Sequence, residues 1–258
     1  MTNAVAKLQP AQAMTVQDQS PLLDPRLFDC AMRLAEIWRY PVKSMGGESL
    51  EHVELDARGL VGDRRYAVVD GDGKLSSGKD SRRFRRRDQV FSYAAGTSAD
   101  GWVEVRRNGS TWVAGDDDLD AELSRAFGDP VRVLAEADVP YFDDGPVSLV
   151  GTASLEWCRR ELGVDADPRR TRTNLVLETT QPFEEETWAG RRLRIGSVEL
   201  SVDRRLERCR MVDLAQDGVT TTTPMLKALG ASRDVCLAML TDVAAPGHLK
   251  VGDVVTVH

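Results

Sequence analysis

Histidine and cysteine are scarce in this sequence of 258 residues, and their scarcity excludes several common catalytic devices. The three histidines, His52, His248 and His258, are too scattered to suggest a zinc cluster. The four cysteines lie far apart, without a C-x-x-C pair: Cys30, Cys158, Cys209 and Cys236. We therefore expect no disulfide framework, closed zinc site or iron–sulfur cluster, and the pattern is typical of a reducing cytoplasm.

Nucleotide-binding and membrane-spanning patterns are also missing. There is no G-x-G-x-x-G or P-loop, and no serine lies within G-x-S-x-G. No apolar run approaches the roughly 20 residues that a membrane helix needs, and the N-terminus lacks the apolar core of a signal peptide. The net charge of −7 argues against general nucleic-acid binding. We expect a cytoplasmic protein that binds neither membranes nor nucleic acid.

Short strand patterns dominate the rest of the chain. Apolar content of 41% and charged content of 29% are ordinary for a globular protein. Alternating or apolar runs predict strands near residues 33–40, 66–69, 102–105, 111–113, 131–134, 174–177, 193–202 and 249–257. Helical spacing predicts helices over 118–128, 152–162 and 224–229. Many short strands with few short helices favour a mainly β, barrel-like architecture.

Composition divides the chain into three parts. Residues 1–30 are rich in Gln, Ala, Pro and Asp without a period, which predicts a flexible N-terminal tail. Residues 135–147 contain two prolines, a glycine and several acidic residues, as linkers do. We therefore predict a β-rich domain over 31–138 and a second domain over 139–258.

Cys209 lies in the segment 205–213 (RLERCRMVD), between two arginines. Nearby positive charge stabilises a thiolate, which is what a soft transition metal or a nucleophilic mechanism requires. The alternative is a small buried hydrophobic residue, since cysteine is among the most buried residue types.

Three further segments concentrate positive charge. Residues 169–174 (RRTRTN) enter a predicted strand, so alternate arginines could point at one anion, or the segment could be a solvated strand end. In residues 40–44 (YPVKS), Lys43 and Ser44 could hold a phosphate, although surface lysines are usually only solvated. The run 82–87 (RRFRRR) could dock an acidic electron carrier, line a cofactor entrance or contact nucleic acid; a solvated edge strand protected by charge is the simpler alternative.

Together these segments resemble the MOSC proteins, which are related to the C-terminal domain of molybdenum-cofactor sulfurases. The resemblance runs in order from about Arg33 to His258 and rests on YPVKS and on Arg208-Cys209 followed by Val-Asp. Supporting positions are 62–64 (GDR), Arg172, Asn174, Trp188, Gly196 and 251–253 (VGD). The pattern is most similar to the mitochondrial amidoxime-reducing component and its bacterial relatives.

The resemblance implies a β-rich N-terminal domain, a β-barrel-like MOSC domain and a molybdenum cofactor (molybdopterin) between them. It implies that Cys209 is the catalytic thiolate that ligates the metal. It further implies the cofactor-binding residues Lys43, Ser44, Arg64, Thr152, Arg172, Asn174 and Arg208. Pyridoxal phosphate binding is a further property that the resemblance implies at the level of the family.

The implied function is an oxidoreductase that reduces small N-hydroxylated compounds. Relatives often carry a cysteine three residues before the ligand, where this chain has Leu206, so no role is assigned to a second thiol. Some bacterial relatives append a ferredoxin domain; without such a cysteine cluster here, electrons are expected from a separate protein, ferredoxin or cytochrome b5-like with its reductase. The alternative is a cofactor-binding or sulfur-carrier protein that uses Cys209 as a persulfide site.

Overall fold

The structure is a computed structural model that describes Met1 and residues 31–216, 218–219, 221 and 223–258. The predicted tail, apart from Met1, and Cys30 lie outside the described residues. Contacts divide the chain into two units, 1–31 and 32–258, and the helices and strands described belong to the second. Among the described residues, no helix is long and apolar enough to span a bilayer.

An eight-stranded sheet is the largest element of the second unit. Its strand order is β18-β14-β15-β16-β12-β13-β1-β2. The strands are β18 (Val255–Val257), β14 (Arg192–Ile195), β15 (Val198–Glu207), β16 (Cys236–Ala245), β12 (Val147–Gly151), β13 (Leu175–Leu177), β1 (Leu34–Arg39) and β2 (Glu48–Leu50). Only β12 and β13 pair in parallel; the other neighbours are antiparallel. The first strand of the described chain thus completes a sheet built mainly from its second half.

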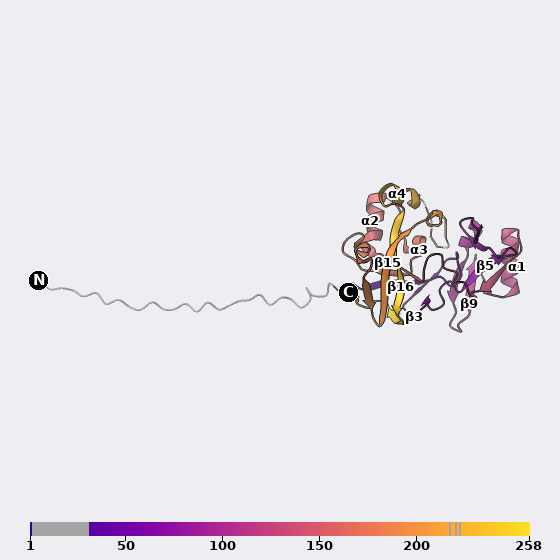
Figure 1. Cartoon of the computed structure of the whole chain (residues 1–258). Helices are drawn as coiled ribbons and strands as arrows, with labels where there is room; N and C mark the ends of the chain where they lie inside the picture. The colour runs from indigo at the N-terminus through magenta and orange to yellow at the C-terminus, as the bar shows by residue number, and fades with distance from the viewer. Residues whose placement is uncertain (2–30, 217, 220, 222) are drawn as a thin grey trace. The chain divides into compact units, whose positions relative to one another are not determined.

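Alternation along these strands explains why the sheet forms. In β14 and the first half of β15, apolar side chains alternate with exposed or half-buried ones, so one face is buried. That face supplies Leu193, Ile195, Leu200 and Val202 to the main core, which Ile37 of β1 joins. Another core lies under the helices α2 (Thr152–Leu162) and α4 (Met225–Ser232). Figure 1 shows both helices beside the long β15–β16 pair.

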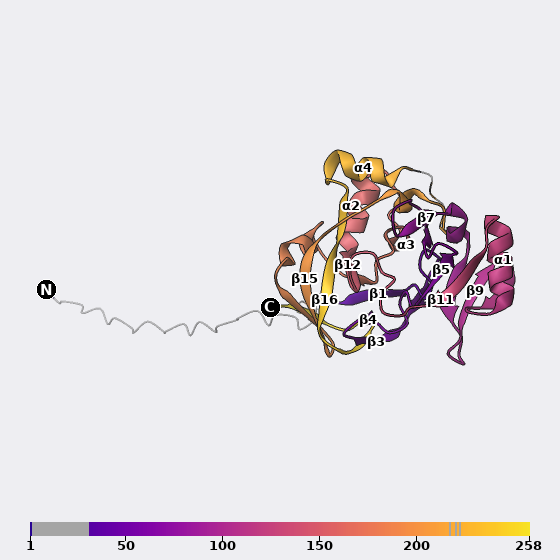
Figure 2. The same ribbon diagram turned by 45° about the vertical axis from the view of Figure 1, so that its right-hand side comes forward.

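The remaining strands form three smaller sheets, with orders β11-β5-β6-β7, β10-β9-β8 and β17-β3-β4. Their bounds are β3 (His52–Asp56), β4 (Gly59–Leu60), β5 (Tyr66–Asp70), β6 (Leu75–Ser77), β7 (Phe84–Arg86), β8 (Ala94–Thr97), β9 (Val103–Arg107), β10 (Ser110–Val113), β11 (Val131–Ala135) and β17 (Gly247–Lys250). Helix α1 (Asp117–Phe127) inserts Leu119 and Leu123 into the core beside β11 and β9. Figure 2 shows α1, β5, β9 and β11 together, with α2, α4 and the β15–β16 pair on the opposite side of the unit.

The mainly β fold class predicted from sequence is confirmed, and most predicted elements occur within a few residues of their expected bounds. Helix α2 has the predicted bounds, and Gly163 ends it with a left-handed φ of 63°. The boundary between the two predicted domains stays a prediction.

One helical turn was not predicted. Residues 168–171 form α3 (Pro168–Thr171), ahead of the predicted strand, which is present as β13 (Leu175–Leu177). Asp167 accepts a hydrogen bond from the Arg169 amide as its N-cap, and proline occupies the first turn. Among the described residues, three 3₁₀ turns complete the fold: η2 (Asp88–Ser92), η3 (Glu184–Trp188) and η4 (Arg210–Asp213).

Candidate functional site

A cavity of about 190 Å³ lies where the turn after β1, the connection between β11 and β12, α3 and the end of β15 meet. Seven of the residues predicted from sequence line it: Lys43, Ser44, Arg64, Arg172, Asn174, Arg208 and Cys209. In the sequence these residues lie up to 166 positions apart. The folded chain brings the three predicted segments to one place. Their roles as ligands stay a prediction.

Two tight turns form one wall. Ser44 and Arg64 have left-handed backbones, with φ of 67° and 50°. The Tyr40 amide donates to Asp63 Oδ1 at 2.8 Å and the Arg64 amide to the Tyr40 carbonyl at 2.8 Å, which locks the turns together. Residues other than glycine seldom adopt such a conformation, and those that do gather at functional sites.

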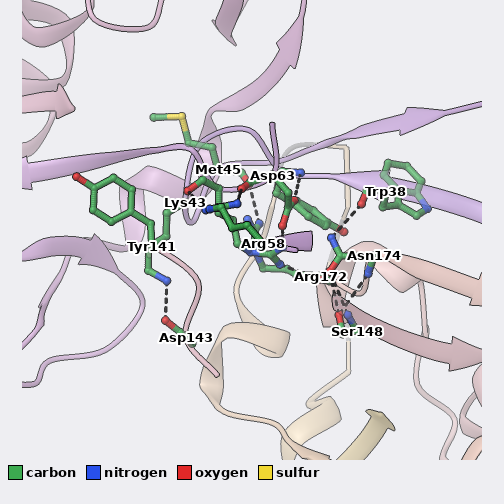
Figure 3. A network of polar contacts seen from close by, with 12 residues as sticks. Trp38, Lys43, Met45, Arg58, Asp63, Tyr141, Asp143, Ser148, Arg172 and Asn174 are labelled. Atoms are coloured by element: carbon green, nitrogen blue, oxygen red, sulfur yellow. Dashed lines mark hydrogen bonds and ion pairs between the residues drawn. The ribbon is translucent and has the colours of Figure 1, made fainter. Parts of the chain in front are cut away.

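Arg172 and Asn174 form a neighbouring part of the lining, directly after α3. Arg172 is the C-cap of α3, with a φ of 54°, and its Nη1 donates to the Met45 carbonyl at 2.6 Å. Figure 3 shows Asn174 between Trp38 and Ser148; its Nδ2 donates to the Trp38 carbonyl, and its Oδ1 accepts from the Ser148 amide, both at 3.2 Å. Asn174 therefore fastens β1 to β12, beside the cavity.

Two guanidiniums in this cavity keep an unused donor. Nη2 of Arg172 and Nη2 of Arg208 are both buried and have no hydrogen-bond partner among the residues that the structure describes. The other nitrogens of Arg208 donate to the carbonyls of Leu237, at 2.6 Å, and Thr171, at 3.0 Å. Among the described residues no carboxylate forms an ion pair with either arginine. Burial lowers the pKa of each to about 10. Uncompensated buried charge of this kind favours an anionic ligand.

Other cations of the cavity are paired. Arg64 forms a close ion pair with Asp63. Lys43 Nζ donates to Asp143 Oδ1 at 2.6 Å, and Lys79 Nζ lies 3.4 Å from Asp143 Oδ2. Burial lowers the pKa of Lys43 to about 8, although the adjacent Asp143 carboxylate opposes the shift. Positive charge therefore exceeds negative charge in the cavity.

Cys209 follows β15 and is the N-cap residue of η4, with an extended backbone and half-buried surroundings. Its two arginine neighbours diverge. Arg208 lines the cavity, whereas Arg210 forms a bidentate ion pair with Asp88, with distances of 2.8 and 3.0 Å. Of the cysteines that the structure describes, only Cys209 lines the cavity, since Cys158 and Cys236 are buried elsewhere.

Some predicted residues are placed differently. Thr152 does not line the cavity: it begins α2, where its hydroxyl accepts from the Thr179 amide at 3.1 Å. The solvated strand end considered for residues 169–174 is wrong, because Arg170 and Arg172 are buried. The side chain of Arg170 is satisfied by the carbonyls of Asp165, Val212 and Thr223 and by Asp213, so it does not share an anion with Arg172.

Asp143 and Lys79 line the cavity but were missed by sequence reasoning, as were Asp144, Ser148 and Glu207. Asp143 was assigned to a linker, and Lys79 was given no role. Neither carries a local signal, since only the fold brings them to Lys43. The run itself contributes the edge strand β7, and its arginines Arg85, Arg86 and Arg87 pair with aspartates.

Comparison with known proteins identifies relatives along most of the chain. Residues 31–111 match the family model of the MOSC N-terminal beta barrel domain, and residues 125–256, just over half of the chain, match that of the MOSC domain. The chain is similar to molybdenum cofactor sulfurase of Caenorhabditis elegans, with 26% identity over 69% of this chain and 28% of the relative. Against that of Danio rerio, identity is 23% over 90% of this chain and 35% of the relative. It thus spans about a third of the length of these relatives.

Among solved structures, the YuaD protein of Bacillus subtilis superposes with a TM-score of 0.50 at 12% identity. The match covers 88% of this chain and 96% of that protein, and it shows a shared fold alone. The two family models match the halves of the chain in order, and the sulfurase relatives extend over both halves. This chain belongs to the MOSC domain family.

Proposed function

We propose that this chain binds the molybdenum cofactor in the cavity and uses it to reduce N-hydroxylated compounds. One observation carries the proposal: a single thiol, that of Cys209, shares a cavity with cations that lack carboxylate partners among the described residues. A soft or high-valent metal favours a thiolate ligand, and a phosphate favours guanidinium and ammonium groups.

The residues present fit the chemistry of this cofactor. The phosphate would be held by Lys43, Ser44, Arg64 and Arg172, which line the same cavity. The free Nη2 atoms of Arg172 and Arg208 are donors that an anion would satisfy. Cys209 would provide the one protein thiolate. Support also comes from family membership and from the printed names of the relatives, which are molybdenum cofactor sulfurases.

The bound cofactor supplies the two-electron redox centre of the reaction, R–NHOH + 2 H⁺ + 2 e⁻ → R–NH₂ + H₂O. Within this chain, Cys209 would fix the reacting centre, while Arg208 keeps positive charge beside it. Leu206, Met211 and Leu240 add apolar side chains to the lining of the same cavity. The electrons would come from a separate ferredoxin or cytochrome b5-like partner with its reductase.

A second candidate function is a sulfur carrier or cofactor-transfer protein. The similarity to molybdenum cofactor sulfurases favours it. In that function Cys209 would hold a persulfide, and the cationic walls would bind the pterin only transiently. The two candidates differ in what Cys209 carries when the protein is isolated.

The test is to purify the full chain from cells that make the cofactor and to measure molybdenum and pterin per chain. Cys209→Ala is compared with Cys236→Ala, whose thiol is buried in β16 and does not line the cavity. We expect near-stoichiometric metal in the parent and in Cys236→Ala, and its loss in Cys209→Ala. Reduction of a hydroxylamine or an amidoxime with an artificial electron donor should follow the metal content.

Folded parent protein that lacks both metal and pterin would reject the reductase. In that case, intact-mass measurement of one added sulfur on Cys209, absent from Cys209→Ala, would establish the sulfur carrier instead.

A further inference from the structure

Asp143 places a carboxylate against the cationic wall of the cavity. Figure 3 shows Lys43 pointing at it, and the Nζ–Oδ1 distance is 2.6 Å. Its second oxygen lies 3.4 Å from Lys79 Nζ. Both ammonium groups lie over the ring of Phe84, with distances of 5.1 and 4.7 Å to the centroid. One carboxylate therefore neutralises two lysines that share an aromatic platform.

The same cavity contains a hydrogen-bond donor that an anion could satisfy. Arg172 is only 6% exposed, lines the cavity and keeps its buried Nη2 without a partner. An anion that binds there and also uses Lys43 would lie close to the Asp143 carboxylate. Because like charges at such distances repel, Asp143 and the anion compete for Lys43.

The chain around Asp143 is attached at other points. It belongs to the β11–β12 connection, residues 136–146. Arg83 donates to the carbonyls of Pro140 and Phe142, and the Tyr141 amide donates to Glu136 Oε2 at 2.8 Å. The ring of Phe142 lies 5.2 Å from the guanidinium carbon of Arg58. These contacts hold the connection up to Phe142 without the help of Asp143, so release of Asp143 would leave that part in place.

We propose that Asp143 is an internal counter-anion that occupies Lys43 and Lys79 and is displaced by the anionic group of the ligand. Displacement exchanges one ion pair for another, so the lysines never lie buried without a negative charge. The residues 143–146 are then freed each time an anion binds. The identity of that anion as the cofactor phosphate rests on the proposed function; the competition itself concerns any phosphate.

The test uses inorganic phosphate and the full chain purified without cofactor. Asp143→Asn keeps the shape but removes the charge, and Asp138→Asn is the matched control, since Asp138 is an exposed aspartate of the same connection that does not line the cavity. By calorimetric titration, Asp143→Asn should bind phosphate about tenfold more tightly than the parent, and Asp138→Asn should match the parent.

Equal or weaker phosphate binding by a folded Asp143→Asn variant overturns the proposal. Asp143→Ala is the second variant and must show the same gain in affinity. If this gain is observed, while the parent purified from cells that make the cofactor contains neither molybdenum nor pterin, the counter-anion is upheld and only the proposed function is rejected.

Discussion

Arg64 Nη2 donates a hydrogen bond to the backbone carbonyl of Arg172, 3.0 Å away, although the two residues are 108 positions apart. Both guanidiniums also lie over the ring of Tyr40, at 5.0 and 4.3 Å from its centroid. Burial and the nearby Arg64 lower the pKa of Arg172. Two like charges on one ring repel each other, so a bound anion stabilises this arrangement.

The buried arginines Arg170 and Arg172 should differ in how strongly substitution by methionine destabilises the chain. Arg170 has its donors filled by three carbonyls and Asp213, so Arg170→Met should lower the free energy of unfolding by about 3 kcal/mol. Arg172 is incompletely satisfied, so Arg172→Met should change it by no more than about 1 kcal/mol in the cofactor-free chain. Urea denaturation measures both values.

Phosphate binding completes this comparison, because Arg172→Met should weaken it about tenfold. An Arg172→Met variant as unstable as Arg170→Met would show that Arg172 is needed for folding and not for a ligand.

Ser44→Gly should stabilise the cofactor-free chain while weakening phosphate binding. The φ of Ser44 is 67°, a region that glycine adopts without a steric penalty, so we expect a gain of about 0.5–1 kcal/mol. The hydroxyl that faces the cavity is lost. Thermal unfolding measures the stability of Ser44→Gly and of the control Ser49→Gly. Ser49 is an exposed position of β2 without a positive φ, so Ser49→Gly should lower the free energy of unfolding by about 0.5–1 kcal/mol. A loss of stability in Ser44→Gly would contradict the strain argument.

Phosphate binding should weaken as the pH rises through about 8. Burial lowers the pKa of Lys43 from its ordinary 10.5 to about 8, so the ammonium that binds the anion loses its proton there. Titrations between pH 7 and 9 follow the change in affinity. Lys43→Arg keeps its charge over this range, so its profile reports only the change in the charge of phosphate itself. A parent profile that runs parallel to that of Lys43→Arg would refute the assignment of Lys43.

The free energy of unfolding should rise with pH, whereas the affinity for phosphate should fall. Between about pH 8 and 10.5 the unfolded chain binds the Lys43 proton more tightly than the folded chain does. The contribution of Lys43 to the free energy of unfolding therefore rises with pH across that window and is constant below it. Urea denaturation at pH 7.5 and 9.5, with Lys43→Gln as the control without this titration, isolates that contribution.

Gly78→Ala should disturb the turn that carries Cys209. A Cβ at Gly78 would lie 2.7 Å from Leu214 Cδ1 and 3.0 Å from Met211 Cγ, so residues at and after η4 must shift. We expect the free energy of unfolding to fall by about 1–3 kcal/mol. Alkylation of Cys209 should be slower, or its retention of metal altered. Gly71→Ala, which meets nothing within 4 Å and has no positive φ, should be neutral within about 0.5 kcal/mol. Equal effects of the two substitutions would contradict the packing argument.

Sequence reasoning predicted most of the fold and the principal cavity residues, for identifiable reasons. Alternation and turn residues define strands such as β14 and β15, and Gly163 marks the end of α2. The helical turn α3 was missed because three arginines obscured the capping signal of Asp167 before Pro168. That signal was available in the sequence.

Other features could not be predicted because they depend on distant backbone. Arg170 is buried among carbonyls of residues 165, 212 and 223, and carbonyls leave no mark in a sequence pattern. Asp143 likewise contacts Lys43, and Lys79 contacts Asp143, only because the fold brings together segments that are far apart in the sequence. Thr152 was expected at the cofactor only from the resemblance. At the start of α2 its hydroxyl instead accepts a hydrogen bond from the Thr179 amide.

The place of β1 in the large sheet has a consequence for biosynthesis. β1 lies between β13 and β2, and Ile37 pairs with Leu175. The ribosome releases β1 early, but its partner β13 emerges only after β2 to β12, α1 and α2 have been made. Such non-local pairing slows folding and leaves strand edges open to other chains. A fragment that begins at residue 125, where the MOSC family model starts, would lack β1 and expose the edge of β13. The two halves are therefore expected to mature together on or after the ribosome, and a gene that separated them would need both products in the same cell.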